Sequence, residues 1–367
     1  MKVLITGANG FIGKHLNLRL QENGGIEVLT FNRGDSFESL TQLVTKADTI
    51  VHLAGEMRPK NSEDLIAVNV DLTRRICEIL RTLCNDKFLI LASSVQAEQD
   101  SLYGVSKLQA EKEVTDLSVE VGTSIAIYRL PHVFGKWCKP NYNSVIATFC
   151  HNISRGLPIR IDDPSALITP VFIDDVIDEF FFSIKNRTNG VRIGRVEPEY
   201  SISVGELANI LYDFSSPVKS FIDHTASGLI RALYSTYISY VPVEKFTYEL
   251  PIDEDSTGCF VEILRSKHSG QVSFFTLRPG VTRDNHYHHT KTEKFLVVSG
   301  RARLRFRHLV TLERFEITVA GEKPMVVQSI PGWVHDITNT GENDAVVLIW
   351  ANELFDRDRP DTFLCKV

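Results

Sequence analysis

Two groups of residues in this 367-residue chain have types and spacings suited to chemistry. Near the N-terminus, Gly7, Gly10 and Gly13 stand between an apolar segment and a helical pattern. Glycines at this spacing let the backbone turn tightly and approach a pyrophosphate, and the following helix offers free N–H groups and a favourable dipole. The context favours a dinucleotide-binding turn over the alternative, a purely structural turn.

The residues after the second apolar segment indicate which dinucleotide is bound. NAD-binding proteins usually place an acid at this strand end to hold the ribose 2′-hydroxyl. Here Arg33 stands there, and an arginine pairs well with a 2′-phosphate. The sequence therefore predicts NADPH rather than NADH, with a solvated surface arginine as the alternative. The residues of both segments expected to contact the cofactor are Gly7, Gly10, Phe11, Ile12, Gly13, Asn32 and Arg33.

A second set of residues could move a proton. Ser94 ends an apolar segment, and Tyr103 and Lys107 lie four residues apart at the start of a helical pattern, which puts both on one helix face. A nearby ammonium favours tyrosinate, so we expect the phenol to exchange protons with a carbonyl near neutral pH, while the serine hydroxyl holds the carbonyl oxygen.

The second chemical group lies in the last third of the chain. His286 and His288 point to the same side if they lie on a strand, and Glu293 and His335 can come from neighbouring strands. Three imidazoles and one carboxylate suit a divalent transition metal, and we expect one ion, zinc, at these four residues. His289 points the other way and is not expected to be a ligand.

Two different patterns of elements must position these groups. The first half alternates strands and helices, which predicts a parallel sheet covered by helices. Its expected strands are 3–6, 27–31, 49–53, 88–92 and 124–129, and its expected helices are 12–23, 62–82 and 103–120. The last third reads as short strands separated by turns, which predicts a sandwich or barrel. Its clearest strands are 271–277, 294–298, 302–307, 315–319, 325–330 and 345–350.

The composition limits the class of protein. A net charge of −6 and a pI of about 6.0 argue against nucleic-acid binding. The six cysteines form no Cys-x-x-Cys pair, which favours a reducing cytoplasm. No apolar run approaches the ~20 residues of a membrane span, and a first strand starting at residue 2 leaves no room for a signal peptide. We expect a soluble cytoplasmic protein without membrane insertion.

Residues 1–245 resemble an extended short-chain dehydrogenase/reductase of the nucleotide-sugar type, with a Rossmann-like doubly wound sheet. Beyond the motifs above, the matching segments are Val51-His-Leu-Ala-Gly55, Asn69-Val-Asp-Leu-Thr73, Arg129-Leu-Pro-His-Val-Phe-Gly135 and Val171-Phe-Ile-Asp-Asp175. The resemblance implies that Leu53, Ala54 and Gly55 line the cofactor, and that Tyr103 is the acid/base with Ser94 as its partner. It implies that Lys107 binds the nicotinamide ribose, and that Arg129 and His132 meet a sugar substrate. The spacing from Ser94 to Tyr103 is shorter than usual, which predicts a trimmed loop over the active site.

Residues 255–367 resemble a cupin, an all-β double-stranded β-helix barrel with two motifs around its metal. The second motif departs from the pattern because glycine directly follows Pro331. Cupins have many functions, so this fold alone assigns none.

The order of the two domains resembles the CapF/WbjC family of bifunctional capsular polysaccharide synthesis enzymes. The resemblance implies a homodimer acting on a UDP-linked 2-acetamido-2,6-dideoxy-4-keto-hexose. The cupin would epimerise carbon 3 and the reductase would reduce the carbon 4 ketone with NADPH, giving UDP-2-acetamido-2,6-dideoxy-L-talose on the route to UDP-N-acetyl-L-fucosamine.

Several alternatives stay open at this point. The metal can be catalytic or structural, and the epimerase base is not identified, with Tyr287, His289 and Lys294 as weak candidates. The chain can also be a single-activity reductase with a structural cupin, or a non-catalytic NADPH-sensing regulator. The presence of Ser94, Tyr103 and Lys107 together argues against the regulator.

Overall fold

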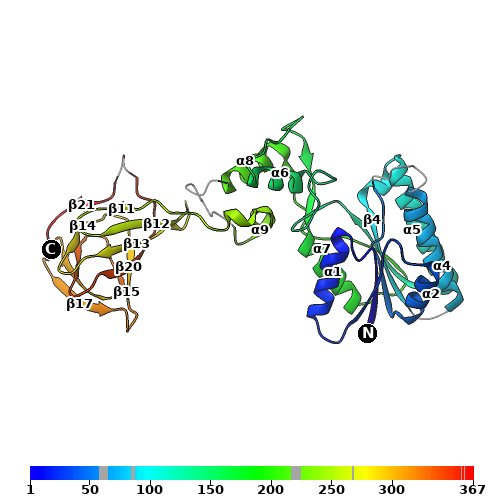
Figure 1. Ribbon diagram of the computed structural model, residues 1–367, viewed down its shortest axis with the longest axis horizontal. Helices are drawn as coiled ribbons and strands as arrows, with labels where there is room; N and C mark the ends of the chain where they lie inside the picture. Colours follow the sequence, from blue (N-terminus) through cyan, green and yellow to red (C-terminus); the bar gives the residue numbers. More distant parts are fainter. Residues whose placement is uncertain (58–64, 84–86, 216–224, 267, 357, 359) are drawn as a thin grey trace. The chain divides into compact units, whose positions relative to one another are not determined.

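The computed structural model describes residues 1–57, 65–83, 87–215, 225–266, 268–356, 358 and 360–367 (Figure 1). The chain divides into two compact units, Met1–Leu211 with Ala232–Val241 and Tyr212–Arg231 with Pro242–Val367. The sequence predicts a first domain at residues 1–245 and a second at residues 255–367; the two compact units differ from this in that residues 212–231 belong to the second unit.

The first unit is built on a six-stranded parallel sheet in the order β2-β1-β3-β4-β5-β9. Its strands are β1 (Lys2–Thr6), β2 (Glu27–Phe31), β3 (Thr49–His52), β4 (Phe88–Ser94), β5 (Ser124–Leu130) and β9 (Val191–Gly194). The strands β3 and β4 are buried along their whole length, because a parallel sheet with helices on both faces excludes water from both sides. The prediction of a Rossmann-like parallel sheet is confirmed.

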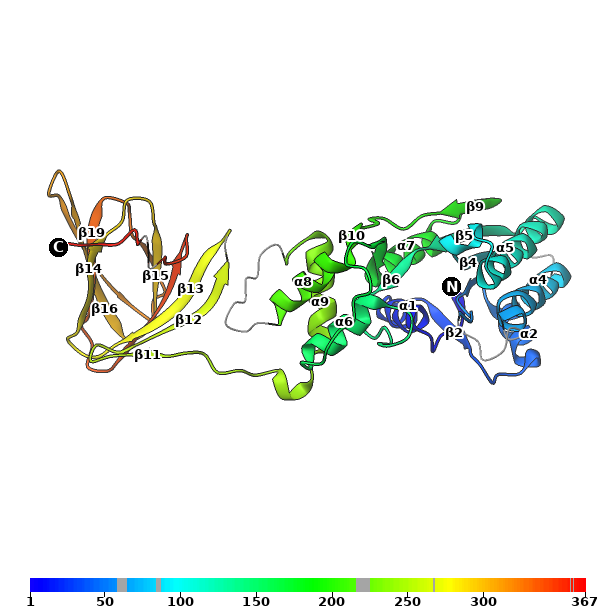
Figure 2. The same ribbon diagram turned by 90° about the horizontal axis from the view of Figure 1, so that it is seen from above.

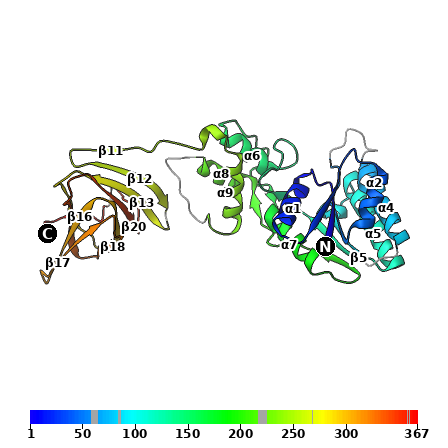
Figure 3. The same cartoon turned by 60° about the horizontal axis from the view of Figure 1, so that its bottom comes forward.

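Helices cover both faces of this sheet (Figure 1, Figure 3). One face carries α1 (Phe11–Glu22) and α7 (Ile173–Lys185), which contact each other. The other face carries α2 (Phe37–Lys46), α4 (Leu72–Leu83) and α5 (Leu102–Val121). A π-helical segment, Ala67–Asp71, precedes α4. Residues 62–64 of the expected 62–82 helix lie outside the described residues.

The strand order creates a crevice at one edge of the sheet. The chain passes from β1 to β2 on one side and then to β3 on the other side of β1. Such a reversal separates the loops that follow the two central strands, and ligands of open α/β sheets bind in that gap. Gly7 and Ala54, which follow β1 and β3 closely, are placed there by the topology.

The remaining described elements up to residue 245 lie outside this six-stranded sheet. The strands are β6 (His132–Phe134), β7 (Leu167–Ile168), β8 (Pro170–Phe172) and β10 (Ile202–Ser203). The helices are α6 (Val145–Ser154), α8 (Val204–Phe214) and α9 (Gly228–Tyr240), with 3₁₀ turns at Val95–Glu98 and Val243–Lys245.

The second unit contains two antiparallel sheets (Figure 2). The first has the order β11 (Asp253–Glu254), β12 (Cys259–Ser266), β13 (Gly270–Leu277), β20 (Ala345–Ala351), β15 (Glu293–Ser299) and β18 (Val326–Gln328). The second has the order β17 (Arg314–Ala320), β16 (Arg301–His308), β19 (Trp333–Asn339), β14 (Thr282–Tyr287) and β21 (Phe363–Leu364). Alternate residues of β13 and β16 are buried, and both strands contribute to one apolar core. The prediction of an all-β second domain is confirmed.

Among the helices that the structure describes, none combines the length and the apolar composition needed to cross a membrane.

Candidate functional site

The turn after β1 has no room for side chains at Gly7 and Gly13. Gly7 has φ +70°, and a Cβ on it would lie 2.8 Å from the backbone nitrogen of Ala54. A Cβ on Gly13 would lie 2.3 Å from the Gly7 carbonyl oxygen, so only glycine lets α1 start this close to β1. Gly10 caps α1 without a side-chain hydrogen bond. The turn therefore leaves the first N–H groups of α1, including those of Phe11 and Ile12, available to an anion.

The adenosine end of the predicted cofactor site is held by a network that the sequence did not reveal. Asn32 accepts a hydrogen bond from the Asn9 backbone at 2.8 Å. The Arg33 guanidinium lies 2.8 Å from a Glu56 carboxylate oxygen, and the Arg33 side chain is 81% exposed. Asn69 exchanges two hydrogen bonds with the backbone of Glu56, at 2.8 and 2.9 Å. Arg33 is thus oriented yet remains accessible to a phosphate.

His52, the last residue of β3, fixes the other wall of the crevice. Its Nδ1 lies 2.6 Å from the Thr6 hydroxyl and its Nε2 lies 2.9 Å from the Thr73 hydroxyl. Burial, with a smaller contribution from the Lys107 charge, lowers the pKa of His52 to about 3, so this imidazole is neutral. The Thr6 hydroxyl also accepts the Ala54 N–H at 3.2 Å, while the Leu53 N–H bonds the Thr6 carbonyl.

The structure places Tyr103 beside both Ser94 and Lys107, and Lys107 beside Gly55. The buried Lys107 ammonium lies 6.0 Å from the centre of the Tyr103 ring and donates to the Ala92 carbonyl at 3.1 Å. A Cβ on Gly55 would lie 3.2 Å from Lys107 Nζ. Burial lowers the pKa of Lys107 to about 8, although the nearby Glu111 carboxylate opposes the shift.

The protonation expected for Tyr103 is wrong in this structure. Burial raises the pKa of Tyr103, and this effect outweighs the hydrogen bond with Ser94, which lowers it. The phenol is therefore protonated at neutral pH. A protonated phenol suits donation of a proton to a ketone that is being reduced.

Arg129 and His132 lie in different surroundings. The Arg129 guanidinium pairs with the buried Glu111 carboxylate at 2.7 Å and with Glu98 at 2.6 Å, and Ser93 also donates to Glu111. His132 is exposed at the start of β6. Two carboxylates thus engage Arg129. Glu111 was not identified from the sequence, although Glu111 lies four residues after Lys107 and so on the same helix face.

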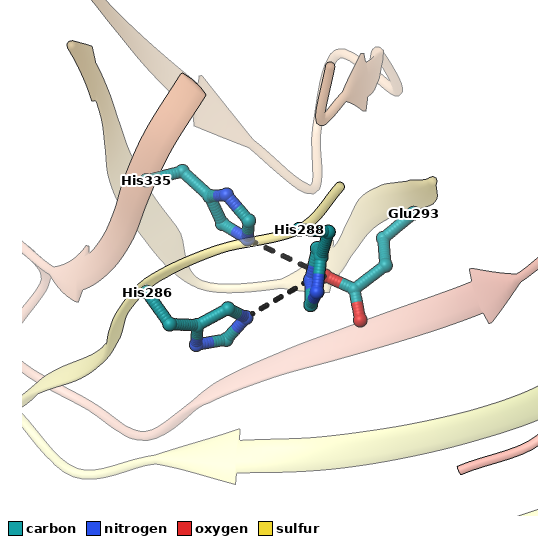
Figure 4. A group of neighbouring side chains, drawn as sticks. All are labelled: His286, His288, Glu293 and His335. Atoms are coloured by element: carbon teal, nitrogen blue, oxygen red, sulfur yellow. Dashed lines mark hydrogen bonds and ion pairs between the residues drawn. The ribbon is translucent and has the colours of Figure 1, made fainter. Parts of the chain in front are cut away.

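The four predicted metal ligands converge in the second unit (Figure 4). The Nε2 atoms of His286 and His288 lie 3.1 Å apart. One carboxylate oxygen of Glu293 lies 3.3 Å from His288 Nε2 and 3.4 Å from His335 Nε2. One ligand atom from each residue fits within 4.8 Å. His288 lies one residue beyond the end of β14, yet its ring faces the same side as that of His286.

The donor atoms fit a divalent cation. Among the described atoms, Glu293 Oε2 and His335 Nε2 are buried without a hydrogen-bond partner. His288 Nδ1 donates to the Asp361 carbonyl, which leaves His288 Nε2 facing the cluster. Burial and the neighbouring His335 lower the pKa of His286 to about 3, so the His286 ring is neutral. Burial alone would lower the pKa of His335, but the Glu293 and Asp284 carboxylates outweigh burial and raise it while no cation is bound. Imidazoles around a carboxylate are the ligands that a transition metal such as zinc prefers.

Burial raises the pKa of Glu293, but the facing His288 and His335 and the Lys291 charge outweigh it. The net result is a pKa well below the usual range, so Glu293 is ionised and supplies the negative charge of the set.

The segment before β19 ties two of the ligands together. Ser329 and Glu293 exchange hydrogen bonds at 2.8 and 2.9 Å. The N–H of Gly332, the glycine that departs from the expected motif, donates to the His288 carbonyl at 2.9 Å. The altered turn therefore still connects to the ligand set.

A cavity of about 650 Å³ reaches this cluster. Lys291 and Glu293 both line it, and Lys291 Nζ lies 2.8 Å from the Glu293 oxygen that faces away from the histidines. Tyr248, Arg265 and Gln271 contribute to the other walls. The sequence reasoning missed Lys291, because nothing local distinguishes it from a surface lysine.

The three weak candidates for a base lie elsewhere. Tyr287 stacks on Phe363 with ring centres 5.3 Å apart, His289 contacts the same two rings, and Lys294 lies over Trp350. Among the described residues that line the cavity, none of the three appears.

Comparison with known proteins covers both units. Residues 3–197 match the NAD-dependent epimerase/dehydratase family, and residues 253–363 match the polysaccharide biosynthesis C-terminal domain. The chain is 50% identical to UDP-2-acetamido-2,6-beta-L-arabino-hexul-4-ose reductase of Pseudomonas aeruginosa over 100% of this chain and 99% of that protein.

Solved structures also resemble this chain. Capsular polysaccharide assembling protein CapF from Staphylococcus aureus matches 100% of both chains with a TM-score of 0.90 and 40% identity. The UDP-glucuronic acid 4-epimerase of Bacillus cereus, in complex with NAD, matches 66% of this chain and 96% of that chain with a TM-score of 0.57 and 18% identity, a likeness of fold alone. This chain belongs to the family of CapF-like capsular polysaccharide enzymes, and its first domain is a nicotinamide-dependent oxidoreductase.

Proposed function

We propose that the first domain reduces the carbon 4 ketone of a UDP-linked 2-acetamido-2,6-dideoxy-4-keto-hexose. The protonated Tyr103 donates a proton to the ketone oxygen, the Ser94 hydroxyl holds that oxygen, and Lys107 binds the nicotinamide ribose. The single observation that carries this proposal is that Tyr103 lies beside both Ser94 and Lys107, with Lys107 next to Gly55. The name of the Pseudomonas relative, which is a keto-sugar reductase, supports the same substrate class.

The reductant proposed is NADPH. Its hydride would add to carbon 4, its pyrophosphate would lie on the N-terminus of α1, and its 2′-phosphate would meet Arg33. The support is that Arg33 is oriented by Glu56 while remaining exposed. Leu53, Ala54 and Gly55 form the opposite wall of this cofactor site.

We propose that the second domain, a cupin, epimerises carbon 3 of the same sugar. That carbon is adjacent to the ketone, so a base can remove its proton and an acid can return one on the other face. A divalent cation held by His286, His288, Glu293 and His335 would stabilise the negative charge on the enolate oxygen. The cavity beside Glu293 offers a place for the sugar ring.

The two steps form a sequence. Epimerisation needs the ketone and therefore comes first, and reduction then fixes the new configuration as UDP-2-acetamido-2,6-dideoxy-L-talose. The family resemblance supports action as a homodimer in the cytoplasm.

Two variants separate the two activities. Tyr103→Phe should abolish NADPH oxidation, followed at 340 nm, while epimerised keto-sugar still forms. His288→Gln should abolish epimerisation and metal binding while reduction of a supplied 3-epimer continues. Tyr212→Phe, on the exposed side of α8, is the matched control and should behave as wild type. Retained NADPH oxidation in Tyr103→Phe would refute the reductase assignment, and full epimerisation in His288→Gln would refute the catalytic metal.

A further inference from the structure

The last residues of the chain form a segment, residues 361–365, that we call the C-terminal latch. Its strand β21 pairs with β14, which places Leu364 opposite the metal ligand His286 and Phe363 opposite Tyr287. The Cys365 N–H donates to the Asn285 carbonyl at 2.9 Å. The latch therefore lies along the strand that ends at the first two ligands.

Asp361, the first residue of the latch, binds the loop between two ligands. Its carboxylate accepts backbone N–H groups from His289 at 2.9 Å, Thr290 at 2.7 Å and Lys291 at 2.9 Å. The Thr290 hydroxyl adds a fourth hydrogen bond at 3.0 Å. Three successive N–H groups that face one carboxylate form a backbone anion site, and such a site fixes the loop conformation.

The charge of Asp361 is matched to this task. Burial raises the pKa of Asp361, but the hydrogen bonds from Lys291, His289 and Thr290 together outweigh burial and lower the pKa well below its usual range.

The same residue also contacts a ligand directly. The Asp361 backbone carbonyl accepts a hydrogen bond from His288 Nδ1. Because a carbonyl oxygen can only accept, this bond places a proton on Nδ1 and leaves Nε2 facing the cluster. The hydrogen bonds between the Asp361 carboxylate and residues 289–291 fix the position of Asp361. The Asp361 carbonyl, held in that position, then orients the His288 ring.

We infer that Asp361 is a positioning residue for the metal, and that the C-terminal latch is part of the metal centre. This inference rests on the metal site proposed above. Outer hydrogen-bond partners of metal-binding histidines typically change metal affinity by about 10–100-fold when they are removed. Asp361→Ala keeps the backbone carbonyl but removes the four side-chain contacts that position it.

The test measures binding of Co²⁺ to the full-length, metal-free protein by chelator competition and by the visible absorption of the bound ion. We expect Asp361→Ala to weaken Co²⁺ binding about 10–100-fold and to alter the absorption spectrum, because His288 changes its orientation. Asp361→Asn keeps one acceptor oxygen and the side-chain shape, so its affinity should lie between those of wild type and Asp361→Ala.

The matched control is Asp358→Ala. Asp358 is exposed, and its carboxylate accepts no hydrogen bond from any residue that the structure describes. This variant should bind Co²⁺ as the wild type does. A merely stabilising tail would shift the unfolding midpoint of metal-free Asp361→Ala and leave both Co²⁺ affinity and spectrum unchanged.

Wild-type affinity and spectrum in both Asp361 variants would overturn the inference, as would equal weakening in Asp358→Ala. If Asp361→Ala does not fold, Asp361→Asn decides alone, because it retains the shape of the side chain. His288→Gln tests the metal site separately. Wild-type Co²⁺ binding in His288→Gln would refute the proposed metal site itself. Loss of binding in His288→Gln together with wild-type binding in the Asp361 variants would refute only the role of the C-terminal latch.

Discussion

Replacing Gly13 by alanine tests the cofactor turn. The new Cβ would lie 2.3 Å from the Gly7 carbonyl oxygen and 2.8 Å from the Ala8 Cα, and both are backbone atoms that cannot rotate away. The start of α1 must therefore move away from β1. Overpacking of this kind costs about 1–3 kcal/mol, against a gain of up to about 1 kcal/mol from better helix propensity.

The same shift should weaken cofactor binding. It displaces the first N–H groups of α1, and a lost charge-assisted hydrogen bond costs about 1.5–3 kcal/mol, or roughly 10–100-fold in affinity. Gly24→Ala is the control, because no atom lies within 4 Å of its added Cβ and its φ is not positive.

The assay combines urea unfolding with fluorescence titration of NADPH. We expect Gly13→Ala to lower the unfolding midpoint and to bind NADPH at least about tenfold more weakly, while Gly24→Ala stays close to wild type in both. If Gly13→Ala kept the wild-type midpoint and NADPH affinity, our reading of the turn would be refuted.

Three further predictions follow from individual side chains. Arg33→Ala should raise KM for NADPH about fivefold and leave KM for NADH unchanged, since an exposed contact contributes about 1 kcal/mol; equal changes for both cofactors would contradict the assignment. Because burial lowers the pKa of Lys107 to about 8, the ammonium loses its proton above that pH, so kcat/KM for reduction should fall there; a profile flat to pH 10 would contradict this. Burial raises the pKa of Asp284 to about 6. Ionisation of Asp284 therefore destabilises the fold increasingly as the pH rises from about 4 to about 6, and the destabilisation is complete above about pH 6. Asp284→Asn should therefore stabilise the metal-free protein at pH 8 by on the order of 2 kcal/mol and change little at pH 4, as measured by urea unfolding.

Residues whose role depends on local spacing were predictable from the sequence. The glycine turn and the parallel sheet follow from short patterns, and His286, His288 and Glu293 lie within eight residues of one another. His335 could be added because its residue type completes the ligand set.

Residues that act through long-range contacts were not predictable. Asp361 is 72 residues from His289, whose N–H it accepts, and Glu56 meets Arg33 only because β2 and β3 lie on either side of β1. The protonation of Tyr103 depends on burial, which no local pattern reports.

The central claim is that two reactions occur on one keto-sugar. Proton NMR of the protein with a UDP-linked 2-acetamido-2,6-dideoxy-4-keto-hexose in deuterium oxide, before any NADPH is added, tests it most directly. Our account predicts that deuterium enters carbon 3 in this first stage, and that later NADPH addition reduces carbon 4. NADPH consumption without prior exchange at carbon 3 would contradict the account and leave a reductase with a structural second domain.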